Sequence, residues 1–406
     1  MCVGVAMQPE TLGVLPAPTD FLGWGVSSKT CSDDAFELLD HLSRYLLKST
    51  EAKGYPDLIS FAFFCRRSNL ETIISNSIVD SSLAKMRGVG TLFHITPANI
   101  PMNFALSFIF GFLSGNSNIV KAPIGKFAQA KIFVDAWLRV SESTEFSGAN
   151  LFCDFTRVDP NIELFVAEAD GLLVWGGDRT IQSVRQLKRK PEAISWEFPD
   201  KYSIAMFSAQ AVNHLEENQL QLLAENFYND SLLVDQNACS SPSLLIWVGS
   251  AREVRTARQI FWPVFEKLVE EKDKTIDLAS KITRSVNLAR LSDRTDSIRS
   301  KSDWYSNLIL AWTDELDLID LTENRPKLGL FLEGQMSEVT DLSGCESLLG
   351  PKLQTVSLFQ LDFGLVRSVL REKGSGERVV KVGQALAFSL MWDGKNAIYQ
   401  LSKIVE

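Results

Sequence analysis

The sequence predicts an α/β protein built on a parallel, doubly wound sheet, because short apolar runs alternate with amphipathic helices. Residues 89–95 form one such run, which enters through glycines and ends at Thr96-Pro97. Residues 171–175 form another, which ends at Gly176-Gly177. Residues 33–48 have apolar side chains at helical spacing behind an acidic start, and this pattern predicts a capped amphipathic helix.

The remaining elements are expected in the same alternation. In the first half we expect a strand at 117–120 and helices from about 101, at 128–140 and at 179–190, the last with Asp178 as its N-cap. In the second half we expect strands at 202–207, 244–248, 329–332, 355–359 and 378–382 and helices at 212–227, 251–272 and 275–291. No repeat or low-complexity linker separates them, so we expect packed lobes with a boundary near residues 197–200.

Composition restricts the class of protein. With 406 residues, 45% hydrophobic and 22% charged, the chain can bury a substantial core in two or three lobes. A net charge of -9 argues against a nucleic-acid partner, and the short basic run 185–190 reads as the solvated side of a helix.

Cysteine usage and hydropathy indicate the compartment. Six cysteines without a C-x-x-C pair and only three histidines fit neither a disulfide framework nor a zinc site, so we predict no metal and a reducing compartment. Residues 1–16 lack the features of a leader, and the longest apolar stretch, 104–113, is too short to span a bilayer. We therefore expect a soluble cytoplasmic protein.

Cys239 is the strongest catalytic candidate. It lies in the polar turn 234–242 between two apolar runs, where amide and hydroxyl groups can hold a thiolate and an oxyanion. This placement indicates a nucleophile. The other cysteines are interpreted as buried bystanders: Cys2, Cys31, Cys65, Cys153 and Cys345.

Two further turns are chemically suggestive. Asn99, bracketed by prolines after the run 89–95, can aim an amide donor at an oxyanion, or it can simply cap the next helix. The Gly176-Gly177 turn can present backbone N–H groups and a helix N-terminus to a phosphate, or it can be an ordinary tight connection.

Together these segments resemble the aldehyde dehydrogenase superfamily. Residues 95–99, ITPAN, are similar to its I-T-P-W-N motif, and residues 115–123, GNSNIVKAP, to its G-N-x-V-V-x-K-P motif. Gly176-Gly177 stands where the superfamily has its phosphate turn, and 235–239, DQNAC, where it has G-Q-x-C. Within it, residues 94–118, 235–242, 353–356, 382–386 and 392–394 most resemble LuxC-type acyl-CoA reductases.

The resemblance implies a fold and a domain plan. The fold would be aldehyde-dehydrogenase-like, with a Rossmann-type cofactor domain and an α/β catalytic domain. We expect a helical or irregular segment at 1–60, an NADP-binding domain at 61–199 and a catalytic thiol domain at 200–375. Residues 376–406 are expected to return as strands to the cofactor domain or to form an oligomer interface.

The resemblance also implies an activity, the NADPH-dependent reduction of an acyl thioester to an aldehyde. Cys239 would carry the acyl group, with Asn99 and the Cys239 N–H as the oxyanion hole. Lys121 and Lys126 with no nearby carboxylate favour NADPH over NADH. The implied cofactor-binding residues are Ile95, Thr96, Pro97, Lys121, Gly176, Gly177 and Gln354.

Several alternatives remain open at this point. Glu197 stands near the position of the base of oxidative members, but its motif has lost the glycines, so it is either a proton-transfer residue or a surface carboxylate. The chain is then a reductase, an oxidative aldehyde dehydrogenase, or a catalytically silent protein of the same fold. The expected substrate partner is acyl-CoA or an acyl-carrier thioester. The expected protein partners are a second copy of the chain and an acyl-transferring or acyl-activating protein.

Overall fold

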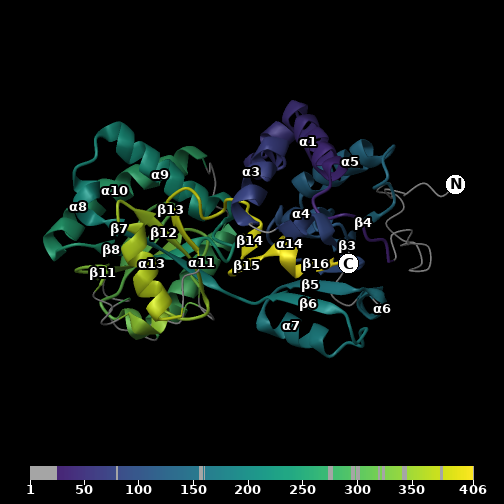
Figure 1. The fold of residues 1–406 in the computed structure, drawn as a ribbon. Coiled ribbons are helices and arrows are strands. Elements are labelled where there is room, and N and C mark those ends of the chain that lie inside the picture. Colours follow the sequence, from purple (N-terminus) through teal and green to yellow (C-terminus); the bar gives the residue numbers. More distant parts are fainter. Residues whose placement is uncertain are drawn as a thin grey trace. The chain divides into compact units, whose positions relative to one another are not determined.

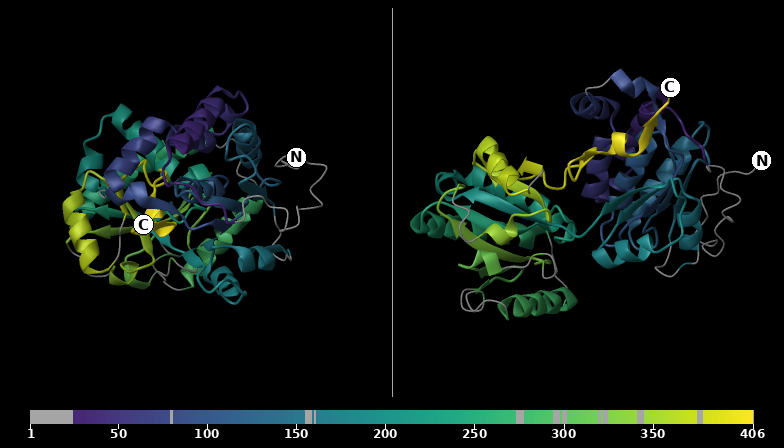
Figure 2. Two further views of the ribbon diagram at one scale, coloured as in Figure 1. Left: turned by 45° about the vertical axis from the view of Figure 1, so that its right-hand side comes forward. Right: turned by 60° about the horizontal axis from the view of Figure 1, so that its bottom comes forward.

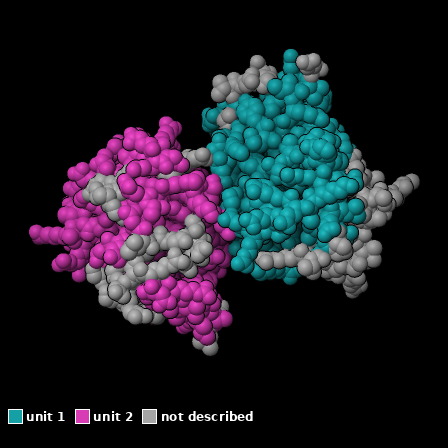
Figure 3. Space-filling view, turned by 90° about the horizontal axis from the view of Figure 1, so that it is seen from below, with its two compact units in different colours: residues 1–199, 388–406 teal, residues 200–387 magenta. Residues whose placement is uncertain are grey.

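The computed structural model describes residues 25–405, apart from gaps at 79–80, 155–158, 160, 273–277, 294–297, 299–301, 319–320, 322–324, 341–344 and 375–377. The chain divides into two compact units (Figure 3). Unit 1 comprises residues 1–199 and 388–406, and unit 2 comprises residues 200–387. Each unit has its own mainly parallel sheet (Figure 1).

The sheet of unit 1 has five strands in the order β4-β3-β2-β5-β6, and all neighbours are parallel. The strands are β2 (Thr91–Ile95), β3 (Ser117–Lys121), β4 (Asn150–Cys153), β5 (Gly171–Trp175) and β6 (Ile194–Phe198). Along the chain, β3 and β4 are added in turn on one side of β2, and β5 and β6 are then added in turn on its other side. The order therefore reverses between β2 and β5, and ligands of such sheets bind at the carboxyl ends of the strands beside the reversal.

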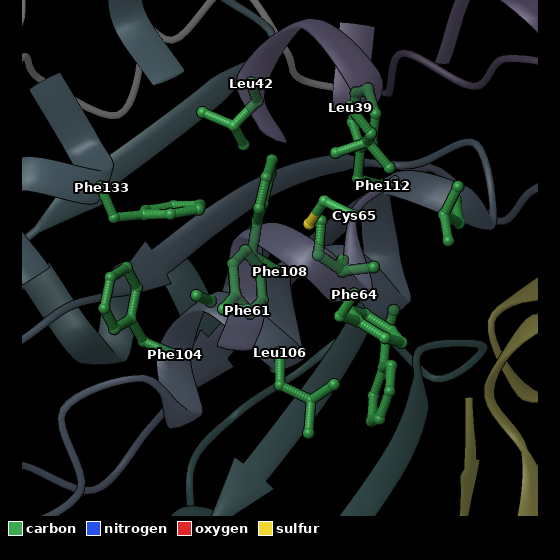
Figure 4. Close-up of a cluster of buried hydrophobic side chains, with 14 of the residues drawn as sticks. Leu39, Leu42, Phe61, Phe64, Cys65, Phe104, Leu106, Phe108, Phe112 and Phe133 are labelled. Atoms are coloured by element: carbon green, nitrogen blue, oxygen red, sulfur yellow. The ribbon is translucent and has the colours of Figure 1, made fainter. Parts of the chain in front are cut away.

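Helices cover both faces of this sheet. On one face, an apolar cluster includes buried residues of α1 (Asp33–Lys48), α2 (Pro56–Phe64), α4 (Asn103–Leu113) and α5 (Ala128–Ser141). It is rich in edge-to-face aromatic pairs, such as Phe108 against Trp137. Phe61 and Phe133 form another such pair (Figure 4). On the other face, α6 (Asn161–Glu168) and α7 (Asp178–Arg185) pack on alternate strand residues.

The C-terminus completes unit 1. Strand β16 (Ser402–Ile404) pairs antiparallel with β1 (Met86–Gly88). The yellow C-terminal end of the ribbon lies among the elements of this unit (Figure 2). Asn116 fastens the same region, because its Nδ2 donates to the carbonyl oxygen of Leu401 at 2.8 Å. The predicted segment 376–406 is thus divided: residues 388–406 belong to unit 1, whereas β13 (Arg378–Lys381) lies in the sheet of unit 2.

The sheet of unit 2 has seven strands in the order β13-β12-β7-β8-β11-β10-β9, parallel except for the edge strand β9. Its strands are β7 (Tyr202–Ser208), β8 (Pro242–Val248), β9 (Ser302–Trp304), β10 (Ile309–Trp312), β11 (Leu330–Met336), β12 (Leu353–Phe359) and β13. The helices α8 (Ala209–Asn213), α9 (Glu217–Ser231) and α10 (Ala251–Lys272) pack on one face. Helices α11 (Leu278–Ser292) and α13 (Phe363–Glu372) pack on the other.

Several elements begin and end where the sequence predicts. α1, β5 and α10 have the predicted bounds, and α1 starts as expected because the Ser32 hydroxyl accepts a hydrogen bond from the Ala35 N–H at 3.2 Å. α10 continues through Pro263, although proline normally interrupts a helix. The first three residues of the predicted helix 275–291 lie outside the described residues.

Two helix predictions are wrong. The predicted helix 212–227 is two helices, because the Glu216 side chain and Gln219 form a capping box that starts α9 afresh. Asp178 is the first residue of α7 and not its N-cap, which is Gly177. The predicted helix 179–190 is also too long, because α7 ends at Arg185 and most of the basic run 185–190 lies beyond it. Lys190 instead forms an ion pair with Asp170 at 2.8 Å.

A buried histidine network joins β2 to its neighbours in unit 1. The Trp175 indole donates to Ser107 Oγ at 2.9 Å, and Ser107 Oγ lies 2.8 Å from His94 Nδ1. His94 Nε2 lies 3.0 Å from the Asn118 amide oxygen, which only accepts. The neutral Nε2–H tautomer therefore satisfies every partner, and burial lowers the pKa of His94 to about 4.

This network predicts acid sensitivity of unit 1. Between pH 6.5 and about 4 the unfolded chain binds a proton at His94 that the folded unit does not, so the free energy of unfolding falls as the pH is lowered through this window. The loss is on the order of a few kcal/mol. Urea unfolding at pH 7 and pH 4.5 measures it, and His94→Gln should flatten the dependence. If the free energy of unfolding of His94→Gln depends on pH as strongly as that of the parent, His94 is not the source of the acid sensitivity.

Candidate active site

The carboxyl ends of β2 and β3 are fastened together in unit 1. The Thr96 hydroxyl donates a hydrogen bond to the carbonyl oxygen of Lys121, the last residue of β3. Ile95 and Thr96 are buried, and Pro97 is half-buried. These predicted cofactor residues therefore lie at one edge of the sheet, at the ends of the two strands on one side of the reversal.

Asn99 lies in an exposed turn between β2 and α4. The N-cap of α4 is Met102, without a side-chain hydrogen bond, so Asn99 does not cap the helix. A residue of the next loop fixes the backbone of this turn, because Lys126 Nζ donates to the Ala98 carbonyl oxygen at 2.7 Å. The amide of Asn99 is thus displayed on a turn whose backbone is tied to the next loop.

The Gly176-Gly177 turn follows β5, on the other side of the reversal. Gly176 donates its N–H to the Phe198 carbonyl oxygen at 3.3 Å, and a Cβ added at Gly176 would lie 3.1 Å from the Thr180 side chain. Gly177 is the N-cap of α7 without a side-chain bond. The Gly176 N–H therefore already donates a hydrogen bond within the sheet. The remaining feature of this turn that attracts a phosphate is the N-terminus of α7.

The expectation that no carboxylate lies near Lys121 and Lys126 is wrong. The sequence shows no carboxylate beside Lys121 and Lys126, but the fold brings one there from β4. The exposed Asp154 follows β4 and accepts a hydrogen bond from the Gly125 N–H at 2.7 Å. A carboxylate at this loop opposes a 2'-phosphate, so the two lysines do not act alone.

Glu197 lies on β6, the edge strand next to β5, and is paired. Its carboxylate accepts from Arg185 Nε at 2.9 and 3.1 Å and from Arg185 Nη2 at 2.5 Å. This forked ion pair occupies both carboxylate oxygens of Glu197 and holds its side chain against Arg185 of α7. The geometry favours the surface carboxylate over the proton-transfer residue.

Cys239 lies in unit 2, on a turn with an unusual backbone. Asp235 and Gln236 have φ values of 52° and 55°, in the left-handed region that residues other than glycine rarely occupy. Gln236 holds the turn with its buried amide, which accepts from the Gly329 N–H at 2.9 Å and donates to the Leu330 carbonyl oxygen at 3.2 Å. Strained backbone of this kind persists where the surrounding structure fixes it, often at functional sites.

The carbonyl group of Cys239 is also fixed. It accepts a hydrogen bond from Ser203 Oγ at 2.7 Å, and Ser203 Oγ in turn accepts from the Thr355 N–H at 3.1 Å. Gln354, the neighbour of Thr355 on β12, is 8% exposed. The predicted residues Cys239 and Gln354 therefore share one end of the unit 2 sheet.

The free thiols of the described residues differ in burial. Cys239 and Cys31 are half-buried, whereas Cys65, Cys153 and Cys345 are buried. Burial raises the pKa of Cys31 to about 12 and raises that of Cys65 and Cys153 as well, so these thiols stay protonated. Cys2 lies outside the described residues.

Two cationic residues beside the turn were missed by the sequence reasoning. Arg325 donates from Nη2 to the Asn237 carbonyl oxygen at 2.8 Å, and the half-buried Lys327 interacts electrostatically with Cys239. They lie almost ninety residues from Cys239 along the chain, in the loop before β11. No local motif marks them, and only the parallel pairing of β8 with β11 brings them to the cysteine turn.

The fold of the whole chain is that of aldehyde dehydrogenases. An AldH of Staphylococcus aureus matches with a TM-score of 0.57 and 13% identity over 91% of this chain and 88% of that one. Aldehyde dehydrogenase 21 of Physcomitrella patens matches with a TM-score of 0.60 and 10% identity, over 91% of this chain and 84% of that one. Propionaldehyde dehydrogenase of a Clostridium phytofermentans microcompartment matches with 0.58 and 10% over 92% of both chains. The predicted fold class is confirmed.

The family follows from the sequence. The model of the acyl-CoA reductase (LuxC) family matches residues 32–259, more than half of the chain, and the chain belongs to this family. A comparison with curated proteins finds no match. The predicted resemblance is confirmed: the chain belongs to the acyl-CoA reductase (LuxC) family and has the aldehyde dehydrogenase fold.

The family and fold imply a nicotinamide cofactor, and the edge of unit 1 suits one. The carboxyl ends of β2 and β5 flank the reversal of strand order, where dinucleotides bind in sheets of this kind. Lys126 and the N-terminus of α7 provide positive charge for phosphates. In the part of the chain that the structure describes, no helix is long and apolar enough to cross a membrane.

Proposed function

We propose that the protein reduces an acyl thioester, carried on CoA or a carrier protein, to an aldehyde with NADPH. The observation that carries the proposal is Cys239, a half-exposed thiol on a strained turn beside two cations. In this proposal unit 1 holds the cofactor and unit 2 supplies the thiol. A nicotinamide bound in unit 1 supplies the hydride.

The chain's own residues account for the acyl transfer. The Cys239 thiolate attacks the thioester carbonyl, a new carbon–sulfur bond forms, and the original one breaks to release the carrier thiol. The carbonyl oxygen becomes negative during this step. We assign its stabilisation to the Asn99 amide and the Cys239 N–H, each contributing about 3 kcal/mol.

The proposal leaves Glu197 out of proton transfer. An oxidative enzyme needs a base that activates water to hydrolyse the acyl-enzyme, but both Glu197 oxygens accept hydrogen bonds from Arg185. This pairing supports reduction over oxidation. Glu197→Gln should therefore keep most of the reductase activity, whereas a true proton-transfer residue would lose about 10²-fold or more.

Free thiol release tests the direction of the reaction. Purified protein with an acyl-CoA and NADPH should release one thiol and one aldehyde for each NADPH consumed. An oxidative aldehyde dehydrogenase would release no thiol from acyl-CoA under these conditions and would instead reduce NADP+ with an aldehyde. A catalytically silent protein would do neither.

The cofactor preference has its own test. The protein should bind NADPH more tightly than NADH, with a preference that shrinks as salt screens Lys121 and Lys126. Asp154→Asn keeps an acceptor for the Gly125 N–H but removes the charge, so it should tighten NADPH binding by about two- to fivefold and leave NADH unchanged. Cofactor fluorescence titration measures both affinities. Equal affinities at low salt, or an equal change for both cofactors in Asp154→Asn, would contradict the proposal.

A further inference from the structure

The loop before β11 is fastened to the cysteine turn on both sides of Lys327. Two residues earlier, Arg325 Nη2 donates to the Asn237 carbonyl oxygen at 2.8 Å. Two residues later, the Gly329 N–H donates to Gln236 Oε1 at 2.9 Å. Lys327 is therefore held opposite the turn that carries Cys239.

The backbone leaves this loop little freedom to move. Leu328 and Gly329 have φ values of 59° and 80°, and a Cβ added at Gly329 would lie 2.7 Å from the Asn307 carbonyl oxygen. Two left-handed residues thus face the two left-handed residues of the cysteine turn, and the buried Gln236 amide joins the two segments. Such strain is maintained only when the surrounding contacts fix the conformation, and it often marks a functional site.

The surroundings of Lys327 favour its neutral amine form. Burial is the largest influence and lowers the pKa of Lys327, and the neighbouring Arg325 cation lowers it further. Cys239 and Asp200 oppose both influences through their negative charge. Lys327 therefore gives up its proton more readily than an exposed lysine does.

We propose that Lys327 exchanges a proton with the Cys239 thiol and delivers that proton to the departing thiol of the substrate. The neutral amine takes the proton of Cys239, which leaves a thiolate beside an ammonium group. The thiolate forms a bond to the carbonyl carbon, and the bond to the carrier sulfur breaks. The ammonium then protonates the carrier thiolate, so that one free thiol leaves and the amine is neutral again. The second half of this cycle rests on the proposed function, and the first half does not.

Arg325 is a positioning residue in this scheme. Its guanidinium already donates to the carbonyl oxygens of Lys201 at 3.1 Å and Asn237 at 2.8 Å. A guanidinium also cannot release a proton under physiological conditions. Of the two cations, only Lys327 suits proton exchange.

Alkylation of the thiol tests the pair without any acyl substrate. The rate of Cys239 carbamidomethylation by iodoacetamide, followed by peptide mass from pH 6 to 10.5, should fall about tenfold at pH 7 in Lys327→Met and recover at high pH. Lys327→Arg keeps the positive charge and should restore the rate at pH 7. Lys381→Met, on the exposed end of β13, should behave as the parent does. An unchanged rate at pH 7 in Lys327→Met would overturn the proposal, whatever the protein's substrate is.

Thiol release from acyl-CoA separates proton exchange from simple charge stabilisation. Lys327→Arg should alkylate at the parental rate but release thiol at least about 10²-fold more slowly, because arginine cannot exchange the proton. Its pH profile should also lose the limb that Lys327 contributes. If Lys327→Arg restores both alkylation and thiol release, Lys327 is only a counterion and the proposal is wrong. If the parent alkylates as expected but releases no thiol, the proposed function fails and the thiol–amine pair stands.

Discussion

Cys239→Ala should abolish acylation, with a loss of at least about 10⁴-fold in thiol release, because no other nucleophile takes the place of a missing thiolate. The thiol is half-exposed on a turn fixed by Gln236 and Ser203, so the change removes reactivity and leaves the turn in place. Incubation with acyl-CoA in the absence of NADPH should add one acyl mass to the parent and none to the variant. Peptide mapping should place the added mass on Cys239.

A matched variant separates reactivity from general damage. Cys31→Ala removes another free, half-buried thiol, one whose raised pKa keeps it protonated, and this variant should acylate at the parental rate. Cys239→Ser should keep the fold and remain inactive, since a hydroxyl is a far weaker nucleophile at neutral pH. Acylation of Cys239→Ala at any appreciable rate, or a normal yield of aldehyde, would show that the acyl group is carried elsewhere.

Asn99→Ala should slow acylation by about 10² to 10³-fold while cofactor affinity stays nearly unchanged, because an oxyanion donor acts only where charge develops. Asn99 is exposed and caps no helix, so its loss should change the free energy of unfolding by less than about 0.5 kcal/mol. Stopped-flow thiol release measures the step, and cofactor fluorescence reports binding.

Asn99→Asp provides the matched control, because it keeps the shape of the side chain and reverses its electrostatic effect. A carboxylate presents negative charge to a developing oxyanion, so this variant should be at least as slow as Asn99→Ala. Parental acylation in Asn99→Ala, or a joint loss of acylation and cofactor binding, would identify Asn99 as a structural turn residue.

The local sequence determined those features whose physical cause lies within a few residues. Ser32 with the acidic residues after it fixes the start of α1, and the apolar run 171–175 before two glycines fixes β5. The polar turn around Cys239 is equally local, and so is the match of the motifs to the acyl-CoA reductase (LuxC) family. From these features the α/β class and the cysteine candidate follow without a structure.

Tertiary structure decided the features that depend on contacts between distant residues. The strands β4, β6 and β10 were not predicted, and each is stabilised by pairing with a strand from elsewhere in the chain: β4 with β3, β6 with β5 and β10 with β11. Arg185 of α7 pairs with Glu197 of β6, and Asp154 brings a carboxylate to the loop that contains Gly125. Each of these interactions joins residues that carry no motif of their own.

The surroundings of Cys239 show the same division. The sequence marks the thiol, but Lys327 comes to it from almost ninety residues away through the pairing of β8 with β11. Gln236 belongs to the polar turn, but its amide forms hydrogen bonds with the backbone of Gly329 and Leu330, which hold the two loops together. The sequence by itself marks the candidate nucleophile, and only the tertiary structure supplies the charges around it, because electrostatic interaction depends on distance in space and not on separation along the chain.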